Sequence, residues 1–346
     1  MTDQMKILQA IGGAGHGGAE NFFVMLTEAF QQAGLQQHVV TRSHPVRDQR
    51  LQEAGVSMEH LKFGGRLDFQ SPRKLQKIAN EFGPDIFLSW MGRASSMAPK
   101  GDFQRVARVG GYYKLKYFEK CDHIVGITPH LCDYMVELGW PRERTHYIPN
   151  FIRWSPEPAV SRTEFDTPEG APLILCLGRL HPVKGLDTAI KALKDVPDAY
   201  LWIAGDGPLK SELESLTDDL NLKSRVRFLG WRTDKEALLA TANFVLFPSR
   251  QEGFGNVILE SWASKTPMIA TRAEGPSQFI KHGENGLLAD IDNTEQISAL
   301  LNQVISDHKL NNSLKNKGFE DYSRDFTEKA CIRNWKGFFE KICSPA

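Results

Sequence analysis

The sequence predicts an α/β protein made of two doubly wound domains, each with a parallel sheet covered by helices. In the first part of the chain, short apolar runs alternate with stretches of helical periodicity, which is typical of such a sheet. Prolines then gather between Pro149 and Pro172, where apolar periodicity is weak, and this window is the predicted linker. Beyond it the alternation starts again, and 346 residues suit two domains better than one core.

The first domain is predicted over residues 1–155. It opens with an apolar strand at 6–11, a glycine-rich turn at 12–18 and a helix at 19–33, whose apolar residues recur at helical spacing. Further strands are expected at 37–41, 85–90, 105–109 and 123–127.

The second domain is predicted over residues 165–325. Its strands are expected at 173–177, 199–204, 226–229, 244–247 and 267–270, and its helices at 186–193, 209–220, 235–241 and 256–264. Ligands of such sheets bind at the carboxyl ends of the strands, so the loops that follow the strands are the expected site. An aromatic-rich helix at 327–342 ends the chain and is expected to brace one of the domains.

Composition and charge exclude several classes of protein. Lys plus Arg and Asp plus Glu both number 42, so nucleic-acid binding by bulk charge is not expected. The sequence has no GxSxG, HExxH or P-loop motif, which removes the hydrolases and kinases that use them. A polar N-terminus and the lack of a membrane-length apolar run predict a cytoplasmic protein that at most touches a membrane surface. The cysteines form no CxxC pair and are expected to be free thiols: Cys121, Cys132, Cys176, Cys331 and Cys343.

A turn with the spacing GxGxxG runs from Gly13 to Gly18, after a strand and before a helix. This is the dinucleotide-binding fingerprint, but the second strand ends at Arg42, without the acid that would bind a ribose. Arg42 suits a 2′-phosphate, so an NADP-dependent oxidoreductase is one interpretation. The others are a tight turn that lets strand and helix pack, and a turn that contacts a phosphate or sugar from the facing domain.

Arg179 and Lys184 lie five residues apart in the loop after strand 173–177. An arginine supplies a bidentate fork and a lysine supplies a mobile charge, a combination that suits a diphosphate. Gly178 and Gly185 beside them let the backbone approach a ligand closely. The alternative is that both are solvated surface charges, as most lysines and arginines are.

The richest segment follows strand 244–247 and consists of Glu252-Gly-Phe-Gly-Asn-Val-Ile-Leu-Glu260. Gly253 and Gly255 expose the backbone at the start of a helix, where free N–H groups favour a phosphate. Glu260 lies inside that helix among apolar residues, so its carboxylate needs hydrogen-bond donors such as two sugar hydroxyls. The alternative is a helix-capping turn with a partly solvated Glu260. After strand 226–229, Trp231 is placed to stack on a base, although burial in the core is the commoner fate of tryptophan.

In their order and spacing, these segments resemble the large family of retaining glycosyltransferases with the GT-B fold, family four, which includes lipopolysaccharide and mannosyl transferases. The match runs through almost the whole second domain and is thinner in the first. The matching residues are Gly17-Gly-Ala-Glu20, Gly178-Arg179, Lys184-Gly185, Gly205-Asp-Gly-Pro208, Phe228-Leu-Gly230, Glu252-Gly-Phe-Gly255 with Glu260, and Gly275-Pro276. The resemblance implies two Rossmann-like domains that face each other across a cleft. The first lies on the acceptor side, the second holds the nucleotide-sugar donor, and a C-terminal helix at 326–346 crosses back to the first.

The resemblance also implies roles for individual residues. Lys184 and Arg179 bind the donor diphosphate and Glu252 faces the donor sugar, so these three are the implied catalytic residues. Glu260 binds the ribose. The other implied nucleotide-sugar contacts are Gly17, Gly18, Gly230, Trp231, Gly253, Phe254, Gly255, Asn256, Val257 and Ile258.

The implied reaction moves a hexose-type sugar from a UDP- or GDP-sugar to an acceptor hydroxyl, with retained anomeric configuration and without a metal or other cofactor. Expected partners are that donor and a saccharide or lipid-linked acceptor of lipopolysaccharide, polysaccharide or glycolipid synthesis, with peripheral contact at the inner face of the membrane. Asp290 and Asp292 match a short acid pair with which some glycosyltransferases hold a metal, but a solvated loop is predicted here. A sugar-nucleotide-binding protein without catalysis is the non-enzymatic alternative.

One departure from the family affects the first domain. Many relatives have a histidine after a first-domain strand that contacts the donor sugar, and the equivalent stretches here, 90–93 and 110–116, have none. Arg93, Tyr112 and Lys114 are the candidates for this acceptor side of the site. The stretch 110–120 is aromatic and basic, which suits an anionic lipid-linked acceptor or a membrane surface. Packing of an aromatic-rich helix is the plainer interpretation, and the one we favour.

Overall fold

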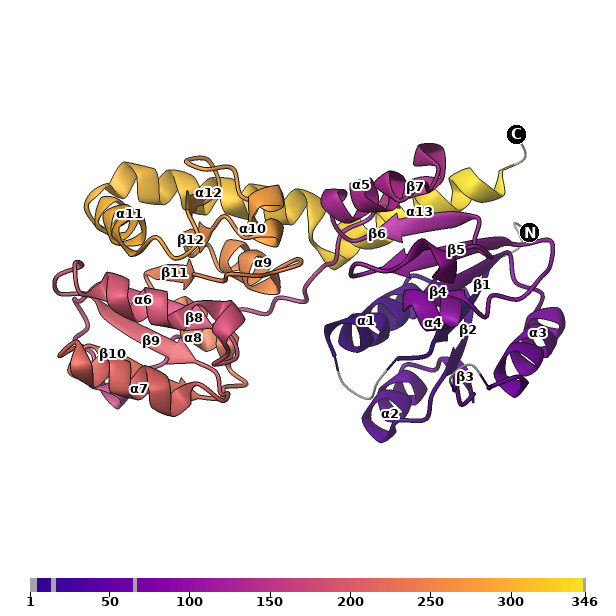
Figure 1. The fold of residues 1–346 in the computed structure, drawn as a ribbon, viewed down its shortest axis with the longest axis horizontal. Coiled ribbons are helices and arrows are strands. Elements are labelled where there is room, and N and C mark those ends of the chain that lie inside the picture. The colour runs from indigo at the N-terminus through magenta and orange to yellow at the C-terminus, as the bar shows by residue number, and fades with distance from the viewer. Residues whose placement is uncertain (1–4, 14–16, 65–66, 345–346) are drawn as a thin grey trace. The chain divides into compact units, whose positions relative to one another are not determined.

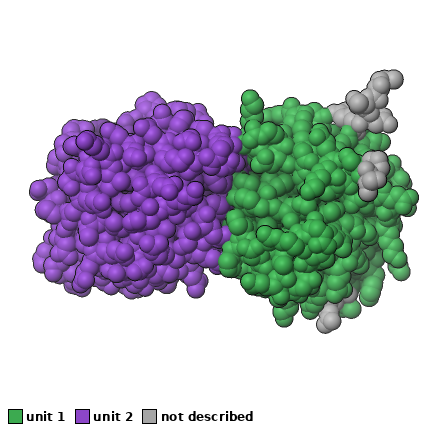
Figure 2. Space-filling model, turned by 90° about the horizontal axis from the view of Figure 1, so that it is seen from above, with its two compact units in different colours: residues 1–150, 328–346 green, residues 151–327 purple. Residues whose placement is uncertain are grey.

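The structure is a computed structural model that describes residues 5–13, 17–64 and 67–344. The chain divides into two compact units: unit 1 contains residues 1–150 and 328–346, and unit 2 contains residues 151–327 (Figure 2). Each unit has a wholly parallel sheet with helices packed around it (Figure 1). The predicted fold class, two doubly wound Rossmann-like domains, is therefore confirmed.

Unit 1 has a seven-stranded sheet in the order β3-β2-β1-β4-β5-β6-β7. Its strands are β1 (Lys6–Ile11), β2 (Gln36–Thr41), β3 (Ser57–His60), β4 (Ile86–Trp90), β5 (Gln104–Val109), β6 (His123–Gly126) and β7 (Thr145–Tyr147). Its helices are α1 (Gly18–Gln32), α2 (Pro45–Glu53), α3 (Gln70–Phe82), α4 (Met91–Ser95), α5 (Pro129–Glu137) and α13 (Glu328–Cys343).

The last helix of the chain completes the core of unit 1. Phe30 of α1 lies edge-on to Trp335 and Phe339 of α13, with ring centroids 5.9 Å apart in both pairs. All three rings are buried, and burial of one such side chain stabilises a fold by roughly 1.5–3 kcal/mol. The apolar face of α13 therefore holds it on unit 1, although most of that unit precedes it by far in the sequence.

Unit 2 has a six-stranded sheet in the order β10-β9-β8-β11-β12-β13. Its strands are β8 (Leu173–Leu177), β9 (Tyr200–Ala204), β10 (Val226–Gly230), β11 (Phe244–Phe247), β12 (Met268–Thr271) and β13 (Leu287–Ala289). Its helices are α6 (Leu186–Leu193), α7 (Lys210–Asp219), α8 (Lys235–Thr241), α9 (Asn256–Ala263), α10 (Glu274–Phe279), α11 (Thr294–Ser306) and α12 (His308–Asp325).

Several elements agree with the prediction residue for residue, among them β8, α6 and α8. Strands β3, β7 and β13 were not predicted. They are only three or four residues long, which is too short to show a period, and β3 is also largely exposed. Four of the cysteines are buried, and burial raises the pKa of Cys121 to about 12. Within the described ranges, no helix is both long and apolar enough to cross a membrane.

Candidate functional site

The strand order places a topological switch point in each unit. In unit 2, β8 lies between β9 and β11, so the chain winds in one direction from β8 to β10 and in the other from β11 to β13. The loops after β8 and β11 therefore leave the sheet toward opposite faces and open a crevice at its carboxyl edge. In unit 1 the same reversal occurs between β1 and β4. Ligands of doubly wound sheets bind at such points.

Lys184 and Glu252 meet at the switch point of unit 2. Lys184 ends a short 3-10 turn after β8, and Glu252 lies in the loop after β11. The Nζ atom of Lys184 lies 2.5 Å from Oε2 of Glu252, and the side chains are 20% and 18% exposed. Nζ also lies over the ring of Phe247, 5.4 Å from its centroid. Two of the three predicted catalytic residues are thus in contact, and Arg179 has an exposed side chain in the same loop as Lys184.

Two glycines allow these loops to approach closely. Gly185 has a φ of +61°, and a Cβ atom there would lie 2.1 Å from the carbonyl oxygen of Pro248. The N–H of Gly275 donates a hydrogen bond of 2.7 Å to the carbonyl of Glu252. A Cβ atom on Gly275 would lie 2.8 Å from that same oxygen. Any larger residue would push the Glu252 loop away.

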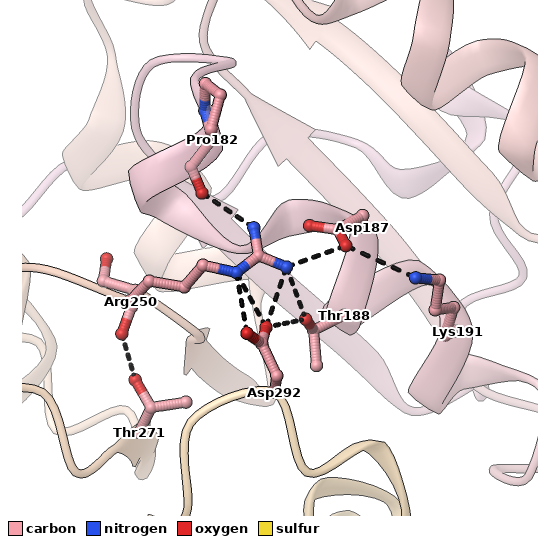
Figure 3. A network of polar contacts seen from close by, with 8 residues as sticks. Pro182, Asp187, Thr188, Lys191, Arg250, Thr271 and Asp292 are labelled. Atoms are coloured by element: carbon pink, nitrogen blue, oxygen red, sulfur yellow. Dashed lines mark hydrogen bonds and ion pairs between the residues drawn. The ribbon is translucent and has the colours of Figure 1, made fainter.

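Arg250, which sequence reasoning missed, ties three loops together (Figure 3). Its Nε donates to Oδ1 of Asp292 at 2.8 Å, its Nη2 to Oδ2 of Asp187 at 2.8 Å, and its Nη1 to the carbonyl of Pro182 at 2.7 Å. The hydrogen bond from Arg250 lowers the pKa of Asp292. The segment that carries Lys184 is therefore fixed to the loop that carries Glu252.

Asp290 and Asp292 lie in a solvated loop, as predicted, with side chains 63% and 50% exposed. Asp292 is held by Arg250, and Oδ1 of Asp290 lies 3.2 Å from Nε of Arg272. Each acid is thus paired with an arginine. Among the described residues, no group of three or more His, Cys, Asp or Glu side chains is arranged to hold a metal ion.

Helix α9 begins directly after Gly255, whose φ is +85°. Gly253 and Asn256 are exposed and Val257 is half-buried, so the backbone at this helix start is open to a ligand. The side chains of Phe254 and Ile258 are buried instead. Phe254 lies edge-on to Phe279 with centroids 4.9 Å apart, and the N–H of Ile258 already donates to the carbonyl of Gly255. These two side chains pack the core beneath the loop.

Glu260 is buried at 7% exposure, and its partner is a lysine that the sequence analysis did not single out. Lys235, the first residue of α8, places Nζ 2.5 Å from Oε1 of Glu260. Nothing in the spacing of the sequence relates these two positions.

Trp231 follows β10 and is 73% exposed, so the alternative that it packs in the core is wrong. Gly230 ends β10 with a φ of +66°.

In unit 1 the carboxylate of Glu20 fills the space beside the glycine turn. A Cβ atom on Gly13 would lie 2.2 Å from Oε1 of Glu20, and one on Gly17 would lie 2.4 Å from Oε2. Glu20 is buried at the start of α1, whereas Gly18 and Arg42 are exposed. A buried carboxylate at this helix start repels the phosphates of a dinucleotide, which disfavours the NADP alternative. Gly15, the second glycine of the GxGxxG spacing, lies outside the described residues.

A pocket of about 630 Å³ lies at the switch point of unit 1, beside the ends of β1 and β4. Arg93 lines it and donates from Nη1 to the carbonyls of Gly12 at 3.2 Å and Phe63 at 3.3 Å. The predicted Tyr112 and Lys114 do not line it. Tyr112 instead bonds Nδ1 of His130 at 2.9 Å, and Lys114 is an exposed residue before a 3-10 turn. The pocket wall includes Asp68, Phe69, Tyr113 and Tyr117.

This pocket combines aromatic rings with one carboxylate. Hydrogen bonds from the side chain and the N–H of Ser71, and from the N–H of Gly64, lower the pKa of Asp68 to about 2. Asp68 is therefore a permanent hydrogen-bond acceptor near neutral pH. Rings beside a carboxylate and a guanidinium suit a polyhydroxylated ligand with apolar faces.

Two Rossmann-like units of this kind make up the GT-B fold of glycosyltransferases. Comparison with known proteins places the chain more narrowly. The model of Glycosyltransferase Family 4 matches residues 16–153, and that of Glycosyl transferases group 1 matches residues 160–321. The chain belongs to this glycosyltransferase family.

Two curated relatives are similar over nearly their full length. The lipopolysaccharide core biosynthesis glycosyltransferase LpsE of Rhizobium meliloti is 37% identical over 320 residues, which cover 91% of this chain and 93% of LpsE. LpsD of the same organism, also a lipopolysaccharide core biosynthesis glycosyltransferase, is 34% identical over 340 residues, covering 97% and 98%. Among solved structures, Anabaena HepE in complex with UDP superposes with a TM-score of 0.84 at 20% identity, covering 97% of this chain and all of HepE. The chain is thus a glycosyltransferase.

Proposed function

We propose that this enzyme transfers a hexose from a UDP-sugar to a hydroxyl of a lipopolysaccharide-core saccharide, with retained anomeric configuration and without a metal ion. The observation that carries the proposal is the contact between Lys184 and Glu252 at the switch point of unit 2. A cation for a diphosphate and a carboxylate for a sugar lie there within 2.5 Å of each other. The core-biosynthesis names of the two relatives support the acceptor class.

In the proposed reaction, the bond between the anomeric carbon and the diphosphate oxygen breaks and negative charge builds on the leaving group. Lys184, Arg179 and the backbone N–H groups at the start of α9 stabilise that charge. This is why the proposal requires no metal. Glu252 orients the sugar as positive charge develops on its ring. The leaving phosphate takes the proton of the acceptor hydroxyl, which attacks from the same face.

The nucleotide is proposed to bind with its base on Trp231 and its ribose at Glu260. The exposed indole of Trp231 supplies a face for stacking. UDP is preferred over GDP because the structure of HepE was solved with UDP. The remaining proposed contacts are Gly230 and the backbone groups of residues 253–258.

The acceptor is proposed to bind in the pocket of unit 1. Tyr113 and Tyr117 offer ring faces to the apolar side of a sugar, Asp68 accepts hydrogen bonds from its hydroxyls, and Arg93 binds an anionic substituent. We also propose a cytoplasmic protein with peripheral contact at the inner face of the membrane, where a lipid-linked acceptor is presented. The exposed Tyr112 and Lys114 support that contact.

A thermal-shift panel followed by a transfer assay tests the proposal. UDP should raise the melting temperature, whereas NADPH should not. Transfer from UDP-hexoses to lipopolysaccharide truncated in its core should then proceed in the presence of EDTA, and NMR of the product should show the donor's anomeric configuration. A rise in melting temperature with GDP but not with UDP would show that the donor is a GDP-sugar. A product with inverted anomeric configuration would overturn the retaining mechanism. UDP binding without donor turnover would favour a protein without catalysis.

A further inference from the structure

Helix α8 begins with a charged residue aimed at the buried carboxylate of α9. Nζ of Lys235 lies 2.5 Å from Oε1 of Glu260 and 3.9 Å from Oε1 of Glu236. The Lys235 side chain is 41% exposed, whereas that of Glu260 is 9% exposed. The lysine therefore spans from solvent to a carboxylate inside the fold.

A carboxylate with so little access to water requires a compensating charge or hydrogen-bond donors. Ile258, Leu259, Trp262 and Ala263 of the same helix are all buried apolar residues. Among the described residues, Lys235 is the hydrogen-bond partner that the structure gives the Glu260 carboxylate, and it engages only Oε1. The carboxylate is thus held from one side, and Oε2 keeps its acceptor capacity.

The loop that precedes α8 is itself braced. Arg232 and Asp234 form a paired contact, with Nε to Oδ1 at 2.8 Å and Nη2 to Oδ2 at 2.5 Å. This loop begins at the exposed Trp231 and ends at Lys235. Lys235 therefore links the loop that begins at Trp231 to the carboxylate of Glu260.

We propose that Lys235 is a positioning residue that makes the nucleotide site selective for ribose. Lys235 retains Oε1 of Glu260 when the donor binds, which fixes the rotamer of the carboxylate and aims Oε2 at a ribose hydroxyl. Because a fixed charged acceptor discriminates strongly against a sugar that lacks the matching hydroxyl, the pair selects ribonucleotides over deoxyribonucleotides. This inference rests on the proposed function of Glu260 in binding the nucleotide.

Binding of UDP and 2′-deoxy-UDP to the full chain, measured by calorimetry, tests it. The wild type should bind UDP roughly tenfold more tightly than 2′-deoxy-UDP, as expected for one hydrogen bond to a charged group. Lys235→Met keeps the unbranched apolar part of the side chain and removes the charged amine. It should weaken UDP binding roughly fivefold and reduce the preference for ribose to about twofold or less. Lys235→Arg should restore most of the preference.

The control is Lys223→Met, because Lys223 is a more exposed lysine of unit 2 that pairs with Asp218 at 3.3 Å. It should leave both affinities unchanged. With the UDP-hexose as substrate, Lys235→Met should raise KM with little change in kcat, as removal of a positioning group for binding does. If Lys235→Met keeps the wild-type preference for ribose, Lys235 has no positioning role even though the nucleotide site stands. If the wild type binds neither nucleotide, the proposed function falls as well.

Discussion

Lys184 and Glu252 are 68 residues apart in the sequence, and their side chains form an ion pair of 2.5 Å in the structure. The pair exists because parallel strands β8 and β11 are neighbours in the sheet and end at the same edge. Its surroundings also hold a ring, since Nζ of Lys184 lies over Phe247. The contact makes the role of Lys184 directly testable.

We predict that Lys184→Ala lowers kcat for sugar transfer by about 100- to 1,000-fold, because one charge that stabilises the leaving diphosphate is lost. Initial rates with a UDP-hexose measure this. The matched control is Lys223→Ala, which removes an exposed lysine of the same unit and should keep normal turnover. Near-normal turnover of Lys184→Ala would show that the pair with Glu252 serves only the loop structure.

Arg250 should act on stability as well as on activity. We predict that Arg250→Lys lowers the melting temperature of unit 2 by a few degrees, because a lysine has no fork to bond Asp187 and Asp292 together. Asp292 is half exposed, so solvent screens its ion pair with Arg250. The expected decrease in the free energy of unfolding is therefore about 1–3 kcal/mol. Calorimetric scans measure it. A melting temperature equal to that of the wild type would contradict the proposed brace.

Two glycines with similar backbone angles should respond differently to alanine. Gly185 and Gly283 have φ values of +61° and +83°. A Cβ atom on Gly185 would lie 2.1 Å from the carbonyl oxygen of Pro248, whereas one on Gly283 would meet nothing within 4 Å. Gly283→Ala should lower the free energy of unfolding by about 1–2 kcal/mol, because only the strain of the left-handed backbone is added. Gly185→Ala should cost roughly 3 kcal/mol or more and also abolish transfer. Equal losses in thermal melts would mean that the close approach at Gly185 relaxes without cost.

Unit 1 should become less stable under mild acid. Nδ1 of His123 lies 3.1 Å from Nε2 of His146, beneath Phe338 of α13. Burial, together with the charges of His123 and Lys341, lowers the pKa of His146 to about 4. The unfolded chain therefore binds a proton below about pH 6.5 while the folded one does not, so stability falls between about pH 6.5 and about pH 4.

The variant His146→Asn should flatten this slope, which is at most about 1.4 kcal/mol per pH unit for one histidine. Urea unfolding near neutral pH and near pH 5 measures the slope. His308→Asn, at an exposed histidine of unit 2, should leave it unchanged. An unaltered slope in His146→Asn would assign the acid sensitivity to other groups.

Much of the fold could be predicted because it is encoded locally. Alternating apolar runs located β8, α6 and α8 to the residue, since the period of side chains in a strand or helix is set by its own backbone. The glycines and acids from Glu252 to Glu260 marked a loop and a helix start for the same reason. Short strands such as β7 and β13 escaped because three residues cannot show a period.

The sequence by itself therefore determined the two-domain α/β architecture and the candidates Arg179, Lys184, Glu252 and Glu260. Only the tertiary structure decided their partners. Three contacts depend on which strands are neighbours and which helix faces they cover: Lys235 with Glu260, Arg250 with Asp187 and Asp292, and Glu20 with the glycine turn. Such contacts join residues far apart in the chain, and their geometry is fixed by the packing of the whole sheet, so no local pattern records them.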